Sequence, residues 1–129
     1  MIEKNILNAS ELGCDGVVVG AHDQNFKLDF SLLKRWKTLA GSVKITFHRA
    51  FDVLVNPLDA INQLIDLGFD CILTSGQKEK AEEGIDNLNY WNTKFGSKII
   101  IMPGSGVGVS NCKKFKKAGF KYIHLSAGE

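Results

Sequence analysis

The sequence predicts an α/β fold in which parallel strands alternate with helices. Short apolar runs recur at nearly constant intervals, and helical patterns occupy the intervals between them. The runs are rich in Val and Ile, and each ends in small or polar residues. A run of this kind is typical of a strand buried on both faces. The five runs begin 23 to 28 residues apart, near Val17, Ile45, Ile72, Ile99 and Tyr122.

Helix signals occupy the earlier intervals in chain order. The first expected helix covers residues 2–13 and ends at Gly13, and the second follows an N-cap at Asp29. In the third, Asn56 is the N-cap, Pro57 takes the first helical position, and Gly68 ends the helix. Apolar residues recur in these segments at helical spacing: Ile2, Ile6 and Ala9; Leu32, Leu33, Trp36 and Leu39; Leu58, Ile61, Leu64 and Ile65.

Two further helices are expected later in the chain. Residues 79–95 have a helical pattern that Gly84 divides in two. Ser110 and Asn111 open the last helix, and Gly119 ends it. The order is therefore helix then strand, five times over. Units of about 27 residues with right-handed crossovers leave two architectures, an open doubly wound sheet or a barrel.

The distribution of polar residues on the strands favours the barrel. Thr46 and His48 share one face of their strand, His124 and Ser126 share one face of theirs, and Thr74 stands near a strand end. A barrel that is packed below and functional at its carboxyl-terminal mouth has this pattern. Eight such units need about 215 residues, near the lower end of the usual range for these barrels. This chain has 129 residues and about five expected strands, too few for eight units. We therefore expect an incomplete TIM-type (β/α)8 barrel.

This partial barrel is expected to be one domain over residues 1–129, with about five strands. It is either a piece of a larger domain or a unit that assembles with something that completes it, and a homo-oligomer is one such assembly. Sixteen Lys and Arg against fourteen Asp and Glu leave a net charge of +2, which gives no general electrostatic case for nucleic acid or an anionic membrane.

The N-terminus and the cysteines predict a cytoplasmic protein. No apolar stretch approaches the roughly 18 residues that span a bilayer. The first residues lack the charged-then-apolar order of a signal peptide. Cys14, Cys71 and Cys112 are too few and odd in number for a disulfide framework, so we expect them to be reduced.

Candidate catalytic side chains gather where two strands end. His48 should face the mouth, where a histidine can be a general acid or base, or a metal ligand. Arg49 offers a planar fork for carboxylate or phosphate, and Asp52 follows within one turn and can orient either. The alternative is an ion pair that only locks the loop. His124 approaches the mouth from another side as a second acid, base or metal ligand, or is a hydrogen-bonded interior histidine.

Two loops after strands are candidate anion sites. Glycines let backbone N–H groups approach an anion, and late loops form phosphate sites in many TIM-type barrels. The alternative is that both loops are tight turns that need a positive φ. The candidate anion-binding residues are Thr74, Ser75, Gly76, Gly104, Ser105, Gly106 and Ser126.

The segment ITFHRAFD at residues 45–52 resembles the CutC family, which is named for copper homeostasis. Four further segments agree in order and spacing: GCDGVVVG at 13–20, ILTSGQ at 72–77, IMPGSGV at 101–107 and HLSA at 124–127. The resemblance covers essentially the whole chain. It implies a TIM-type barrel of which this chain corresponds to strands four to eight, a role in copper homeostasis, and copper as the bound metal.

The residues by themselves do not point to copper. Cu(I) prefers thiolate and thioether ligands, and Met102 is the only sulfur expected near the mouth. His48 and His124 are then the candidate metal ligands.

Three hypotheses stay open. The chain is a cytoplasmic CutC-like copper homeostasis protein that binds metal weakly by itself, or it belongs to an enzyme, or it is a truncated fragment without independent activity. In the enzyme, which acts on a small anionic or phosphorylated metabolite, His48 or His124 is the acid or base and Arg49 holds the anion. The sequence assigns no reaction.

Overall fold

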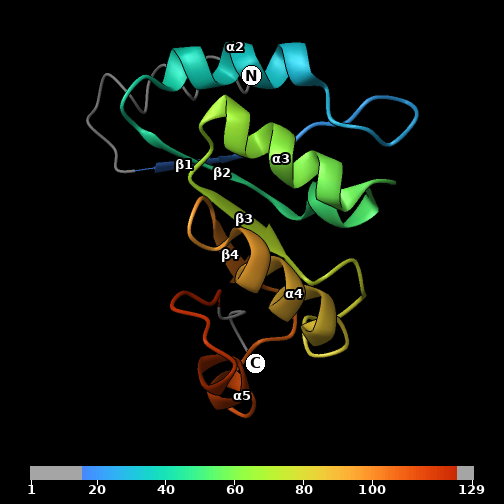
Figure 1. The fold of residues 1–129 in the computed structure, drawn as a ribbon, viewed down its shortest axis with the longest axis vertical. Coiled ribbons are helices and arrows are strands. Elements are labelled where there is room, and N and C mark those ends of the chain that lie inside the picture. Colours follow the sequence, from blue (N-terminus) through green and yellow to red (C-terminus); the bar gives the residue numbers. More distant parts are fainter. Residues whose placement is uncertain (1–15, 125–129) are drawn as a thin grey trace.

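A computed structural model gives the fold of the chain, and it describes residues 16–124 (Figure 1). The first expected helix and Ser126 therefore lie outside the described residues. In chain order the elements are β1 (Gly16–Val19), α2 (Phe30–Ala40), β2 (Lys44–Phe47), the 3-10 helix η1 (Arg49–Val53), α3 (Pro57–Leu67), β3 (Cys71–Thr74), α4 (Ile85–Phe95), β4 (Ile100–Pro103) and α5 (Cys112–Lys117).

The described strands form one parallel sheet in the order β1-β2-β3-β4. Val19 pairs with Phe47, Phe47 with Ile72, and Ile72 with Ile101. This confirms the predicted parallel α/β fold. Each strand lies beside its neighbour in sequence, with no reversal of order. A doubly wound sheet reverses its order at a switch point, whereas a barrel does not, so the topology is that of a barrel segment.

The predicted fifth strand is only begun within the described residues. Residues 122–124 have no strand conformation, although the His124 N–H donates to the Pro103 carbonyl at 2.9 Å. That bond places the segment beside β4, as the next position of a barrel requires.

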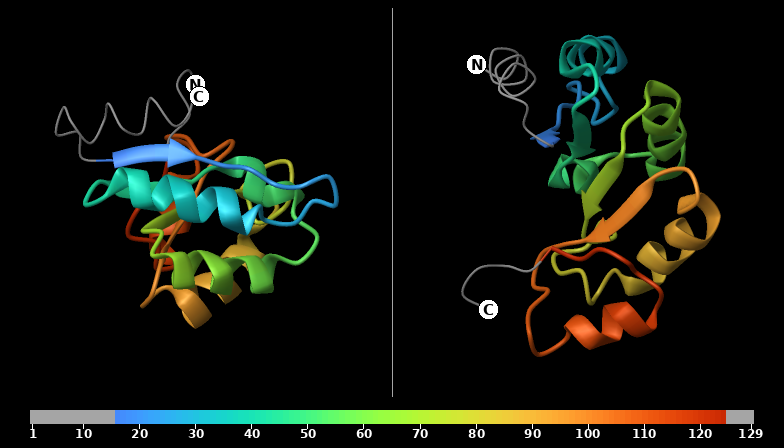
Figure 2. Two further views of the ribbon diagram at one scale, coloured as in Figure 1. Left: turned by 90° about the horizontal axis from the view of Figure 1, so that it is seen from above. Right: turned by 90° about the vertical axis from the view of Figure 1, so that its left-hand side faces the viewer.

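Helices α2, α3 and α4 cover one face of the curved sheet (Figure 2). Ile45, Phe47, Ile72 and Ile101 point into that layer and are between 0% and 2% exposed. The opposite face, called the open face below, is covered less evenly, since Val18 at its edge is 61% exposed whereas Cys71 is 7% exposed. The residues that alternate with the buried ones belong to the open face: Val18, Thr46, Cys71, Leu73, Ile100 and Met102.

The predicted helix boundaries are largely confirmed. The side chain of Asp29 accepts from the Leu32 N–H and begins α2, and that of Asn56 accepts from the Asp59 N–H and begins α3. Gly68 ends α3 in the left-handed conformation at φ 86°. Only the second half of the segment 79–95 is helical, because α4 starts directly after Gly84.

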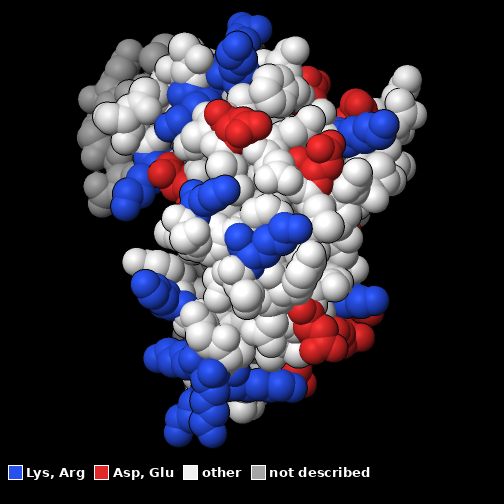
Figure 3. Space-filling view, in the orientation of Figure 1, with Lys and Arg blue, Asp and Glu red and all other residues white. Residues whose placement is uncertain are grey.

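Charged side chains of both signs are spread over the face seen in Figure 3. Lysines gather around α5, which carries Lys113, Lys114, Lys116 and Lys117 on its exposed side. Within residues 16–124, no helix is long and apolar enough to cross a membrane.

Candidate functional site

His48 follows β2 directly and is held by three contacts. Its N–H donates to the Val19 carbonyl at 2.8 Å, which extends the pairing of β1 with β2. Its ring Nδ1 accepts from the Ala50 N–H at 3.0 Å, so His48 is the N-cap of η1. The ring lies against Gly20, where an added Cβ would come within 2.4 Å of Cε1. Gly20 alternates with Val18, so the ring lies on the open face.

Asp52 reaches from η1 into the loop that follows β3. Its carboxylate accepts from the Thr74 hydroxyl at 2.5 Å, from the Ser75 N–H at 3.1 Å and from the Gln77 N–H at 3.1 Å. The Arg49 Nε donates to it at 3.0 Å, and only 8% of the Asp52 side chain is exposed. The loop after β3 therefore wraps around a carboxylate of the protein itself.

This arrangement fills the first of the two predicted anion sites. Thr74 and Ser75 are fully buried, and Gly76 is buried with a φ of 74°. Thr74 shares a face with Ile72 and so points into the helix-covered layer. Backbone N–H groups do converge here on an anion, but that anion is Asp52. The geometry thus supports the structural interpretation of Asp52.

Arg49 is more accessible than Asp52. Its side chain is 43% exposed, and besides Asp52 it donates from Nη2 to the Ser75 Oγ at 3.2 Å. These bonds fix the direction of the guanidinium at the carboxyl end of β2. A half-exposed arginine held by a buried carboxylate can also accept an external anion.

The second predicted anion loop packs against the segment before α4. Ser105 and Gly106 have φ values of 85° and 71°. The Ser105 Oγ donates to the Glu79 carbonyl at 2.9 Å, and the Ala81 N–H donates to the Ser105 carbonyl at 2.9 Å. The Asn111 side chain ties the far end of the loop, since its Nδ2 donates to the Gly106 carbonyl at 3.0 Å. The loop therefore contains the positive φ values that the turn alternative requires.

His124 lies on the open face, apart from His48. A Cβ added at Gly104 would be 2.5 Å from Leu73 Cδ1 and 3.5 Å from the Cβ of His124, so these three positions share one face. Leu73 alternates with Cys71, whose thiol is hydrogen-bonded to Thr46 on β2. The two histidines thus face the same side, but β3 and β4 separate them.

The structure therefore divides the predicted site residues into two groups. Arg49, Asp52 and residues 74–76 come together where β2 and β3 end, with His48 directly before Arg49 in the chain, whereas residues 104–106 and His124 gather beyond β4. Ser126 lies outside the described residues.

Among residues 16–124, no group of three or more His, Cys, Asp or Glu side chains could hold a metal ion. Burial raises the pKa of the Cys71 thiol to about 11, and the carboxylate of Asp70 adds to the shift. A cysteine binds a metal as the thiolate, and the raised pKa makes that form of Cys71 less available.

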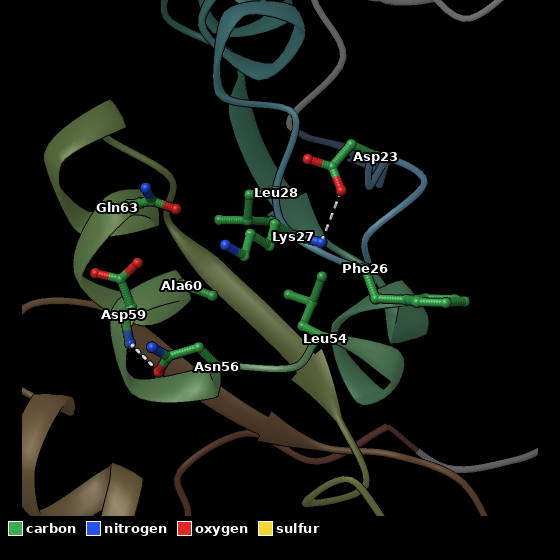
Figure 4. A pocket seen from close by; sticks show the side chains of 9 residues that line it. All are labelled: Asp23, Phe26, Lys27, Leu28, Leu54, Asn56, Asp59, Ala60 and Gln63. Carbon is green, nitrogen blue, oxygen red and sulfur yellow. Dashed lines mark hydrogen bonds between the residues drawn. The ribbon is translucent and has the colours of Figure 1, made fainter.

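A cavity of about 210 Å3 lies outside the mouth, between the loop 23–28 and the start of α3 (Figure 4). Leu28, Leu54 and Ala60 form its apolar wall. Two of its polar lining residues have internal roles, because Asp23 accepts from the Lys27 N–H at 3.1 Å and Asn56 caps α3. None of the predicted site residues lines this cavity.

Sequence reasoning missed two residues of the site, Gly20 and Gln77. The signal for Gly20 was present, since a glycine ends the first apolar run. Gln77 gave no comparable signal. Its Nε2 donates to the Leu54 carbonyl at 2.6 Å, which closes the loop over η1.

The comparisons with known proteins agree with this fold. The family model described as the CutC family matches residues 1–129. A CutC family protein from Pectobacterium atrosepticum is 41% identical over 128 residues, which are 99% of this chain and 50% of that protein. One from Proteus mirabilis is 42% identical over 128 residues, again 99% of this chain and 51% of that protein.

A solved structure from Streptococcus agalactiae, described as a putative copper homeostasis protein CutC, superposes with a TM-score of 0.89 at 30% identity. The match covers 95% of this chain and 61% of that one. The chain spans about half the length of the curated relatives it matches.

Proposed function

The chain belongs to the CutC family, and from this premise we propose that it serves in copper homeostasis in the cytoplasm as part of a TIM-type barrel. The observation that carries the proposal is the family match over residues 1–129. The described strands and the open face fit a barrel segment whose mouth lies at the carboxyl ends of β2, β3 and β4.

This role does not include a tight copper site within residues 16–124. Cys71 is protonated, Met102 offers one thioether, and His48 already uses Nδ1 as an acceptor. A single thioether and separated imidazoles are a poor set for Cu(I). We therefore propose at most weak copper binding by this part of the chain, with His48 and His124 as the available imidazoles.

Metal analysis of the purified chain tests this proposal. The chain is equilibrated with Cu(I) under reducing conditions, desalted, and analysed for copper beside the double variant His48→Gln, His124→Gln. We expect less than one equivalent of copper, falling further in the variant. A full equivalent that survives desalting in both proteins would contradict the assignment of the weak site to these histidines.

A second candidate function is catalysis on a small anionic or phosphorylated metabolite. The observation that favours it is that the half-exposed Arg49 follows His48 directly at the end of β2. In this proposal Arg49 holds the anion and His48 is the acid or base, with residues 104–106 and His124 on the opposite rim. Phosphosugars should then raise the melting temperature of the chain, and less so in Arg49→Met. No stabilisation of a completed barrel would count against this function.

The third hypothesis, a fragment without independent activity, is tested by assembly and folding. Sedimentation gives the oligomeric state, and a thermal melt gives the cooperativity. A homo-oligomer in which a second copy covers the open face would support a complete functional unit. A chain that melts without cooperativity and binds neither copper nor phosphosugar would support the inactive fragment.

A further inference from the structure

Two contacts fix the ring of His48 in one orientation. On one edge, Nδ1 accepts from the Ala50 N–H at 3.0 Å. Against the ring, an added Cβ at Gly20 would lie 2.4 Å from Cε1, 2.6 Å from Nδ1 and 2.8 Å from Nε2. Non-bonded heavy atoms do not approach this closely, so only a glycine leaves room for the ring. Gly20 and His48 come from neighbouring strand ends, joined by the bond from the His48 N–H to the Val19 carbonyl.

We propose that Gly20 is a positioning residue that, together with the Ala50 N–H, fixes His48 as a hydrogen-bond donor through Nε2 to a ligand oxygen at the mouth. The lone pair of Nδ1 receives the Ala50 N–H, so the proton of the neutral ring is on Nε2. The ligand class is then an oxygen acceptor, such as a carboxylate, carbonyl or phosphate. The assignment of an oxygen ligand rests on the small-anion function proposed above. The tautomer and orientation of the His48 ring do not depend on that function.

The same geometry disfavours His48 as a metal ligand. A metal bound at Nε2 requires the ring proton on Nδ1, where a ligating histidine donates it to a carbonyl or a carboxylate. Here Nδ1 faces the Ala50 N–H, so a proton on Nδ1 would set one donor against another. Metal binding at His48 therefore requires the cap of η1 to be broken.

Nitrogen NMR of the chain labelled at histidine tests the state of the ring. The signals of His48 are identified by their loss in His48→Asn. We expect a single tautomer with the proton on Nε2. The variant Gly20→Ala should lose this preference, whereas the control Gly16→Ala should keep it, because a Cβ there would lie an ordinary 3.4 Å from the Lys44 carbonyl. A proton on Nδ1 in the wild type, or an unchanged ring in Gly20→Ala, would overturn the proposal.

A double-mutant cycle keeps the test decisive if Gly20→Ala fails to fold. His48→Asn retains an N-cap acceptor for Ala50 but removes the ring. Gly20→Ala should lower the urea midpoint in the wild-type background and leave it unchanged in the His48→Asn background. Folding of the double variant where Gly20→Ala alone is unfolded supports the proposal. An equal loss in both backgrounds, or a double variant that also fails to fold, would show that the ring is not the obstacle.

Inorganic phosphate and Cu(II) then probe the ligand class. Added phosphate should shift the Nε2 signal of His48. If phosphate causes no shift while the ring keeps its single tautomer, the proposals of an oxygen ligand and of the small-anion function are overturned. The positioning role of Gly20 then still stands. Displacement of the Nε2 proton by stoichiometric Cu(II) would overturn the donor assignment.

Discussion

The carboxylate of Asp52 is the most consequential polar group at the carboxyl ends of the strands, and Asp52→Asn tests whether its role is structural. The substitution keeps the size of the side chain and one acceptor oxygen. Its new amide group is a donor, and at either oxygen position it would face groups that donate: the Thr74 hydroxyl and the Gln77 N–H at Oδ1, or the Arg49 Nε and the Ser75 N–H at Oδ2.

The expected cost follows from the burial of these groups. A buried donor left without an acceptor costs about 1–3 kcal/mol. The loss of the charge from hydrogen bonds that are about twice as strong as neutral ones adds to this. We therefore expect Asp52→Asn to lower the free energy of unfolding by about 2–4 kcal/mol, a large part of the 5–15 kcal/mol typical of a whole domain.

Urea unfolding followed by tryptophan fluorescence measures this loss. The buried Trp91 packs edge to face on Phe51 of η1 with ring centroids 5.4 Å apart, so the probe reports on the element that carries Asp52. Asp66→Ala is the matched control, because Asp66 is exposed near the end of α3, and its loss should change stability by about 0.5 kcal/mol or less. If Asp52→Asn lowers the free energy of unfolding no more than this control does, the carboxylate does not stabilise the fold. That result would favour the catalytic interpretation of Asp52.

Further predictions concern three individual side chains. Phe51→Ala should cost about 3–5 kcal/mol in urea unfolding, because Phe51 is fully buried against Trp91; a cost below 1 kcal/mol would mean that η1 is loosely packed. Asn56→Ala should cost about 1 kcal/mol through the lost N-cap of α3, and an unchanged urea midpoint would contradict the cap. Cys71 should react with iodoacetamide at pH 8 about a hundredfold more slowly in the folded chain than in guanidinium, because its pKa is raised from 9.0 to about 11; equal rates would contradict its burial. Between about pH 9 and about pH 11 the thiol keeps its proton in the folded state and releases it in the unfolded state. The stability that this thiol contributes is therefore lost as the pH rises through that range. Cys71→Ala should remove this part of the pH dependence of the free energy of unfolding.

The regular part of the fold was predictable because it is local. Apolar runs about 27 residues apart predicted the strands, and the signals at Asn56 and Gly68 predicted the ends of α3. These signals depend only on residues that are close to one another in the sequence. The fifth strand was less predictable. Residues 122–124 have no strand conformation, and one described hydrogen bond joins them to β4.

The partners within the site were not predictable, because they depend on which strand ends meet. Alternation predicted that His48 faces the open side, but its contact with Gly20 depends on the register of β1 against β2. The partners of Asp52 lie 22 to 25 residues away in the loop after β3. Thr74 was expected at the mouth because it ends a strand, yet it shares the covered face with Ile72 and is fully buried.

Cysteine labelling at two adjacent positions of β1 tests most directly that the chain forms an open segment of a barrel. In a background without native cysteines, Val18→Cys and Val19→Cys are treated with a maleimide, and the labelling rates are compared. Val18 is 61% exposed and Val19 only 4%. We predict fast labelling at position 18 and strong protection at position 19. Equal rates at the two positions would contradict a sheet with one helix-covered face and one open face.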